Sequence, residues 1–268
     1  MDRWMHTVTI YSLVLSIFIC CSFAEENYCD PSLCDDGLIH TACDHYLEFA
    51  QDCGEDPEFV HLSSLQKRLI LDLHNQHRNK IAQGRLPGYA PASRMPVLRW
   101  NEDLSYVAGL HARSCTTDND NCRNTKSFKN VGQNIGVDML GEPVHNVTAV
   151  IKHIIEAWHS EYKHGNQASI KDLSEETASS MGRFVMMIND LSNDIGCALV
   201  KFFKDDLFHV YFTCNYSSNN HLNQRVYETG PPCSNCQTGC HRLYTALCSP
   251  DEKINPNHHH IETIQSYN

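Results

Sequence analysis

The chain has 268 residues, with 21 Lys and Arg against 32 Asp and Glu, so its formal net charge is −11. A hydrophobic content of 41% with 20% charged residues is a globular composition and excludes a disordered or fibrous chain. The acidic balance argues against nucleic acid as a partner, because phosphate binding needs a basic surface.

Residues 1–24 have the pattern of a secretory signal peptide. Arg3 supplies a positive charge, an apolar stretch runs over 8–21, and Ser22 and Ala24 offer small residues for cleavage before Glu25. The alternative, a membrane anchor, is disfavoured because the stretch is short for a span and nothing basic follows it. No second apolar run of spanning length follows, so we expect a secreted, extracellular protein without a transmembrane segment.

The 14 cysteines support secretion. Two of them, Cys20 and Cys21, lie in the signal peptide, and the even number that remains predicts a disulfide framework. Bridged cysteines leave no thiolate, which disfavours a cysteine nucleophile. A zinc site at Cys233-x-x-Cys236 is a weaker interpretation in an oxidising compartment. The sequons at Asn146 and Asn215 predict glycosylation, although Asn215 adjoins Cys214 in a crowded place.

The predicted elements begin after a loop-rich N-terminal extension, 25–62, which four cysteines staple. Ser63 and Gln66 form a capping box for a first helix that Gly84 ends. Asn101 caps a second helix that reaches Cys115. Val131 to Leu140 reads as a strand, and apolar residues at helical spacing predict a third helix over about 144–162.

The second half of the chain begins with a polar connection, 163–180, and a short apolar helix near 184–188. Strands at 195–203 and 207–214 follow, joined by a hairpin turn at Lys204-Asp205-Asp206. We expect a linker over 217–232, a separate four-cysteine module over 233–248 and a disordered tail over 249–268. The interleaved helices and strands favour an α+β fold with helices layered on a mixed or antiparallel sheet.

Six segments in register over about 60–216 resemble motifs of the CAP superfamily, which comprises cysteine-rich secretory proteins, antigen 5 and plant pathogenesis-related proteins. The segments are Leu73-His74-Asn75-Gln76-His77-Arg78, Leu98-Arg99-Trp100-Asn101, Val131-Gly132-Gln133-Asn134-Ile135, Trp158-His159-Ser160-Glu161-Tyr162, Gly182-Arg183-Phe184 and Tyr211-Phe212-Thr213-Cys214-Asn215-Tyr216. The resemblance implies a CAP domain over 63–216 and a three-layer α-β-α sandwich.

The cysteine-containing segments narrow the resemblance to insect antigen 5, and the last four cysteines resemble the hinge of cysteine-rich secretory proteins. The resemblance implies these pairs: Cys29–Cys43, Cys34–Cys122, Cys53–Cys115, Cys197–Cys214, Cys233–Cys240 and Cys236–Cys248. Each bridge stabilises the fold by about 2–4 kcal/mol, mainly because it restricts the unfolded chain.

Many members of this superfamily carry a cleft with two His and two Glu that can bind a divalent metal. The corresponding positions in this sequence are Asn119, Gln133, Glu161 and Arg183. An amide cannot act as a general base, and a guanidinium cannot bind a metal and repels a cation. We therefore expect no catalytic residue, no metal and no cofactor in a degenerate cleft. A structural pair between Arg183 and Glu161 is the favoured interpretation, ahead of an anion-binding cleft and of a metal enzyme that uses other histidines.

The remaining histidines have ordinary structural interpretations. His74 and His77 are three residues apart on the first helix, and the superfamily motif treats His74 as a packing residue. His153 and His159 lie on the third helix without partners of the metal-site type, and His164 lies in a loop. No hydrolase, zinc-protease or phosphate-loop motif occurs in the sequence.

The resemblance implies a role in venom, saliva, haemolymph or seminal fluid. The favoured hypothesis is a non-enzymatic binding or signalling protein with an extracellular protein receptor as its partner. Two alternatives stay open: a carrier of a small apolar ligand such as a sterol or lipid, and a metal-dependent hydrolase or protease. The second of these rests on fold analogy alone.

Overall fold

The computed structural model describes residues 26–258, so the predicted signal peptide lies outside the described residues. The strands are β1 (Glu55–Val60), β2 (Arg99–Trp100), β3 (Gly132–Leu140), β4 (Asp194–Lys204) and β5 (Leu207–Tyr216). The helices are α1 (Ser64–Ala82), α2 (Glu102–Ala112), α3 (Val147–Ser160), α4 (Gln167–Lys171) and α5 (Glu175–Met187). Short 3₁₀ turns are η1 (Pro31–Leu33), η2 (Gln51–Cys53) and η3 (Glu161–His164).

The sheet has the strand order β1-β4-β5-β3 with antiparallel neighbours, and β2 pairs with β4 in parallel. Between β4 and β5, Asp205 and Asp206 have φ angles of 52° and 59°. Two left-handed residues in succession form the hairpin turn that suits the right-handed twist of strands, which confirms the predicted turn. Directly opposite each other in this hairpin, Cys197 and Cys214 form a bridge.

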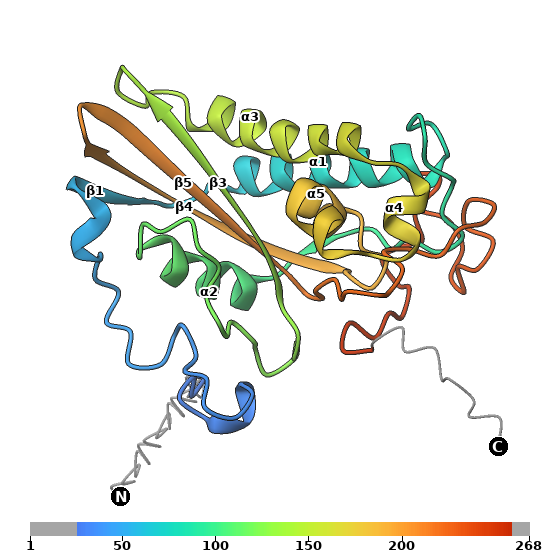
Figure 1. Cartoon of the computed structure of the whole chain (residues 1–268), viewed down its shortest axis with the longest axis horizontal. Coiled ribbons are helices and arrows are strands. Elements are labelled where there is room, and N and C mark those ends of the chain that lie inside the picture. Colours follow the sequence, from blue (N-terminus) through green and yellow to red (C-terminus); the bar gives the residue numbers. More distant parts are fainter. Residues whose placement is uncertain (1–25, 259–268) are drawn as a thin grey trace, which may run out of the picture.

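Helices cover both faces of the sheet: α1 and α3 lie on one side, with α5 beside the end of α3, and α2 lies on the other side (Figure 1). Leu199 and Phe212 point into the main core with α1 and α3. Val200 and Phe202, on the opposite face, pack with Ala112 at the end of α2. Successive residues of a strand point to opposite faces of the sheet. Because apolar residues occur at successive positions here, both faces are apolar and must be buried by helices. This arrangement is the three-layer α-β-α sandwich expected from the resemblance.

The helix starts follow the predicted caps. Ser63 and Gln66 form the capping box of α1, and the Asn101 side chain accepts the Leu104 N–H at the start of α2. Two expectations in the polar segments are wrong. The stretch 163–180 contains the end of η3, all of α4 and the first turns of α5, and 55–60 is a strand. Both carry few apolar residues because α5 begins with exposed turns and β1 is an edge strand with a register irregularity.

The four-cysteine segment does not form a separate module. Its bridges close locally, but Ala246 and Leu247 belong to the main core and Cys248 is fully buried. The Cys248 N–H donates to Met95 O at 2.8 Å, and Tyr244 Oη donates to Asp72 at 2.8 Å. The segment therefore docks because it carries apolar side chains that need burial.

The expected linker and tail are also packed where the structure describes them. Val226 and Tyr227, within 217–232, belong to the main core. Glu252 is buried and accepts from Arg94 Nε at 2.7 Å and from Thr238 Oγ1 at 2.7 Å. The tail is thus ordered to residue 258, and residues 259–268 lie outside the described part.

All six disulfides of the structure join the pairs that the resemblance implies: Cys29–Cys43, Cys34–Cys122, Cys53–Cys115, Cys197–Cys214, Cys233–Cys240 and Cys236–Cys248. Within 26–258, no helix combines the length and the apolar character that crossing a membrane requires.

Candidate functional site

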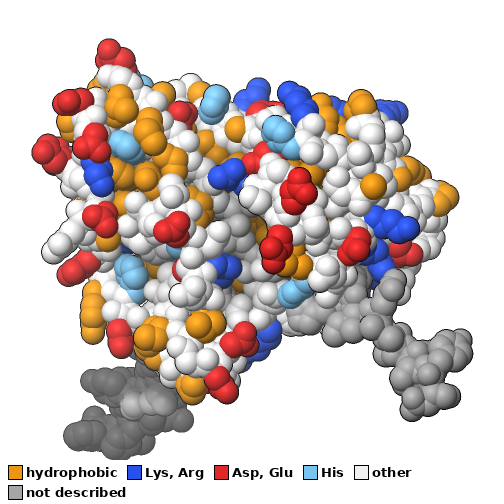
Figure 2. Space-filling model, viewed as in Figure 1, with side chains coloured by type: hydrophobic (Ala, Val, Ile, Leu, Met, Phe, Trp, Pro, Cys, Tyr) orange, Lys and Arg blue, Asp and Glu red, His pale blue; other side chains and the backbone are white. Residues whose placement is uncertain are grey.

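A cleft of about 450 Å³ lies between β3, the loop after α2, α5 and the segment after β5. Asn119, Gln133 and Arg183, three of the four predicted positions, line it. Glu161 is not part of the wall, but it bonds directly to Arg183. The centre of the face in Figure 2, between β3 and α5 of Figure 1, is hollowed and mostly white, the colour of uncharged polar side chains and backbone.

A chain of amide side chains occupies one wall of the cleft. Asn119 Nδ2 donates to Gln133 Oε1 at 2.9 Å, and Gln133 Nε2 donates to Asn215 Oδ1 at 3.1 Å. Asn215 is fully buried and donates in turn to Leu104 O at 3.4 Å. These amides do not titrate near neutral pH, so this wall offers no general base.

Glu161 lies where α3 passes into η3, and its carboxylate has three donors. Oε1 accepts from Arg183 Nη1 at 2.8 Å, and Oε2 accepts from the backbone N–H groups of Arg183 at 2.9 Å and Phe184 at 3.1 Å. The Glu161 side chain is 14% exposed and the Arg183 side chain 56%. The ion pair that the sequence left open is therefore present, with its cation at the rim.

The two backbone donors are available because α5 is broken. Met181, with φ −142° and ψ 30°, interrupts the helical conformation just before Arg183. A helix start leaves its first N–H groups without intrahelical partners, and a carboxylate is the favoured group there. Glu161 therefore caps the second segment of α5, which is a structural role.

The cleft residues do not fit a divalent metal. A guanidinium stands next to the one carboxylate, and neutral amides stand at Asn119 and Gln133. The Asn220 amide, also in the wall, accepts from Asn189 Nδ2 at 2.9 Å, but its own Nδ2 has no partner among the described residues. The cleft thus offers a ligand hydrogen-bond donors. It offers neither a set of metal ligands nor a reactive side chain.

Residues 71–216 match the family model described as the cysteine-rich secretory protein family, CAP. The chain belongs to the CAP family. The CAP protein venom allergen-1 of Aedes aegypti is 34% identical over 229 residues, which cover 85% of this chain and 89% of the relative. The antigen 5 like allergen Cul n 1 of Culicoides nubeculosus is 36% identical over 70% of this chain and 90% of its own. These relatives agree with the antigen 5 resemblance.

Solved CAP structures show the same fold. The crystal structure of NaASP2 with Zn²⁺ matches with a TM-score of 0.60 at 21% identity, over 70% of this chain and 97% of that chain. At this identity the likeness concerns the fold alone.

A second cluster of polar side chains lies outside the cleft, between α1 and α3. The rings of His77 and His159 stack with centroids 3.8 Å apart, and Glu156 Oε1 lies 3.4 Å from His77 Nε2. The expectation that His159 has no partner of the metal-site type is therefore wrong. Sequence periodicity places Glu156 and His159 on one helix face, but only the packing of two helices brings His77 to them.

Burial shapes the charge of this cluster. Burial, with smaller contributions from the nearby charges of His77, Lys80 and Lys163, lowers the pKa of His159 to about 3. Burial also lowers the pKa of His77, against the opposing influence of Glu156. Both rings are therefore neutral at physiological pH, which is the form that offers a nitrogen lone pair.

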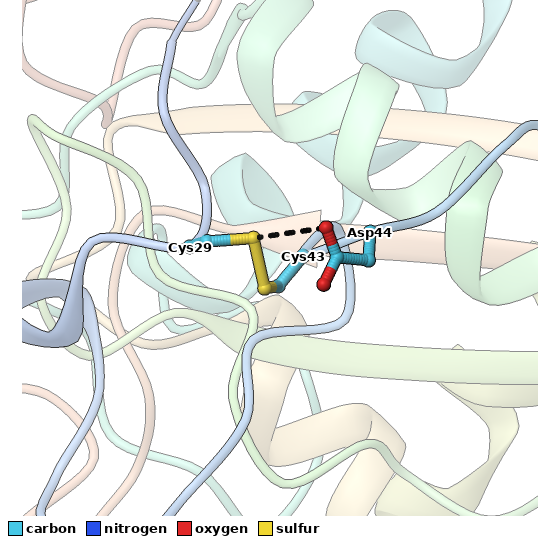
Figure 3. A group of neighbouring side chains, drawn as sticks. All are labelled: Cys29, Cys43 and Asp44. Atoms are coloured by element: carbon cyan, nitrogen blue, oxygen red, sulfur yellow. Dashed lines mark hydrogen bonds between the residues drawn. A yellow bond between two sulfur atoms is a disulfide. The ribbon is translucent and has the colours of Figure 1, made fainter.

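A third cluster combines Cys29, Cys43 and Asp44 in the N-terminal extension (Figure 3). The two sulfurs form a disulfide, and Asp44 Oδ1 lies 3.8 Å from Cys29 Sγ. A bridged sulfur carries no proton to donate and is not a thiolate, so this contact is neither a hydrogen bond nor a metal site while the bridge is intact.

The two sequons lie in different environments. Asn146 is exposed, caps α3 through its side-chain oxygen, and remains the predicted glycosylation site. The predicted glycosylation at Asn215 is wrong for the folded protein. The Asn215 amide is fully buried in β5 and hydrogen-bonded on both sides, which leaves no room for a glycan.

Proposed function

We propose that this CAP protein acts outside the cell as a non-enzymatic binding or signalling protein and that the cleft beside Arg183 is its recognition surface. The observation that carries the proposal is the saturation of Glu161, whose carboxylate is bonded to Arg183 and caps a helix. Three hydrogen bonds, one of them from a guanidinium that repels a cation, disfavour this carboxylate as a general base or a metal ligand. The predicted signal peptide and the six bridges support an extracellular location.

The composition of the cleft wall favours an extracellular protein as the partner. Asn119, Asn220 and Arg183 supply donors, while Met186 and Leu222 supply apolar surface. This mixture suits a peptide segment, whose backbone carbonyls need donors and whose side chains need apolar contact. A sterol or lipid carrier needs a predominantly apolar cavity, which this wall does not favour.

A photo-crosslinking amino acid at Ser179 tests the recognition surface. Ser179 is an exposed residue of α5 in the cleft wall, and Lys152 is an exposed residue of α3 outside it. In the extracellular fluid of the producing tissue, we expect one specific cross-linked protein from position 179 and none from position 152. Equal products from both positions would contradict a recognition role for the cleft.

The hydrolase alternative has a separate test. The purified protein and Glu161→Gln are assayed against protein and ester substrates. We expect no turnover from either, and hydrolysis that persists through purification and disappears in the variant would contradict the proposal.

A further inference from the structure

We propose that His77, Glu156 and His159 form a binding site for a divalent transition-metal ion, with Zn²⁺ as the ion that these donors suit best. The site lies between α1 and α3 and does not depend on the proposed function of the cleft. Two imidazoles and one carboxylate are a common zinc ligand set, which leaves a fourth position for water or another ligand.

The distances bring three candidate ligand atoms together, although they lie further apart than in an occupied site. One nitrogen of each imidazole and one carboxylate oxygen all lie within 4.8 Å of one another. In a tetrahedral zinc site with bonds of about 2.0–2.1 Å, neighbouring ligand atoms are about 3.3 Å apart. Closing this gap requires small side-chain movements, and the Glu156 side chain, 46% exposed, has room to move.

The stacking of the rings defines the movement that binding requires. The ring planes of His77 and His159 differ by only 15°. A metal ion lies close to the plane of each imidazole that binds it, so one ring must turn about its Cβ–Cγ bond to direct its nitrogen at a shared ion.

Both imidazoles have a buried nitrogen without a well-formed hydrogen bond. Nε2 of His159 is buried and makes no hydrogen bond within the described structure, and the one polar neighbour of the buried Nε2 of His77 is Glu156 Oε1, at the long distance of 3.4 Å. His159 is only 6% exposed, so water does not replace the missing bond freely. A buried polar atom without a partner destabilises the folded protein, and a bound metal would remove this cost for each coordinating nitrogen.

A neighbouring histidine on the same helix shows that this is not a general property of the fold. His74 is completely buried, but Nδ1 bonds to Ile70 O at 2.8 Å and Nε2 bonds to Tyr216 Oη at 2.9 Å. His74 therefore has no nitrogen left for a metal, whereas His77, one turn further along α1, has.

Charge around the site limits its affinity without excluding a cation. Lys80 and Lys163 are close enough to act on His159, and the carboxylate of Glu156 offsets part of their charge. Neutral imidazole is the ligand form, so the ion does not have to displace a proton from either ring.

Isothermal titration with ZnCl₂ tests the proposal on the secreted full-length chain. The His258–His260 run of the sequence is a competing set of zinc ligands, so the titration is repeated with all three changed to Gln. In that background we expect one Zn²⁺ per chain. Loss of a direct ligand should weaken binding by about 100-fold or more, since even outer-shell changes cost about 10–100-fold.

The decisive variant is Glu156→Gln, because this exposed side chain can change without disturbing the helix interface, and His77→Gln is the second. His153→Gln, an exposed histidine on the same helix, is the matched control and should bind as the parent does. Circular dichroism confirms that each variant is folded. Absence of the one-to-one site, equal binding by Glu156→Gln and the parent, or loss of binding in Glu161→Gln would each overturn the proposal.

Discussion

Two acidic residues near the end of α3 have opposite surroundings. Glu161 accepts three hydrogen bonds, one from a guanidinium and two from a helix start. Glu156, five residues earlier in the sequence, accepts no backbone N–H among the described residues, and its nearest polar partner is His77 Nε2 at 3.4 Å. Glu161, which occupies a site position of the superfamily, is thus held by hydrogen bonds. Glu156, which does not correspond to a superfamily site residue, keeps carboxylate oxygens that could bind a ligand. Residue type alone does not make a site, because the neighbours decide whether its atoms are available.

The difference comes from the helices that face each residue. Glu161 faces α5, where the break at Met181 exposes two N–H groups. Glu156 and His159 face α1, which presents the ring of His77. A helix start supplies donors to a carboxylate, whereas a helix side supplies only what its side chains carry.

The largest expected effect is that of removing the saturated carboxylate. Glu161→Leu leaves the N–H groups of Arg183 and Phe184 without their acceptor. We therefore expect the free energy of unfolding, measured in urea, to decrease by about 3 kcal/mol. Glu161→Gln retains an acceptor oxygen and should lose less than half of that. A loss for Glu161→Leu as small as that of an ordinary surface substitution would show that the cap does not stabilise α5.

The second prediction concerns acid and uses His74, the saturated histidine of α1. Burial lowers its pKa to about 3, so the folded protein keeps the ring neutral. The unfolded chain takes up a proton near pH 6.5, so this contribution is complete above about pH 6.5 and decreases as the pH falls toward the folded pKa. At pH 5 the loss from this ring is about 2 kcal/mol.

The measurement is unfolding free energy between pH 7.5 and pH 5 for the parent and His74→Gln. The variant should be less stable at pH 7.5 because it loses the bond to Tyr216, but its stability should fall less steeply toward acid. Parallel pH profiles for the two proteins would mean that His74 does not cause the acid sensitivity.

The third prediction concerns the ion pair itself. Because the Arg183 side chain is 56% exposed, the coupling with Glu161 should be modest. A double-mutant cycle with Arg183→Met and Glu161→Gln should give about 1 kcal/mol. Additive effects would place the guanidinium in solvent and favour an anion-binding cleft.

The smallest expected effect is that of Glu156→Gln in the metal-free protein. A half-exposed carboxylate without a well-formed hydrogen bond contributes little, so we expect a change of about 0.5 kcal/mol or less in unfolding free energy. With excess zinc, the parent should become more stable and the variant should not. A large loss without metal would mean that the pair with His77 is structural.

The parts of the fold with strong periodicity or caps were predictable. The Ser63 box, the Asn101 cap and the apolar runs of β4 and β5 each specify an element locally. The edge strand β1 and the polar start of α5 were not predictable from the sequence, because their apolar contacts come from partners distant in sequence. The docking of the four-cysteine segment escaped prediction for the same reason.

The candidate site was predictable only in part. The residue types at Gln133 and Arg183 were enough to predict a cleft that differs from the superfamily's metal site. The cap made by Glu161 depends on a break at Met181 that no sequence pattern marks, and the meeting of His77 with His159 depends on how α1 packs against α3. The Asn215 sequon, in turn, gave no indication that its amide is buried.

Between α1 and α3, His77, Glu156 and His159 have atoms available to bind a cation. At the cleft, the Glu161 carboxylate is instead occupied by its hydrogen bonds to Arg183 and Phe184. Anomalous diffraction at the zinc absorption edge, from crystals of the protein soaked in dilute ZnCl₂, tests both statements in one map. The account predicts a peak bounded by His77, Glu156 and His159, with none beside Glu161. A peak beside Glu161, or no peak between the two helices, would contradict it.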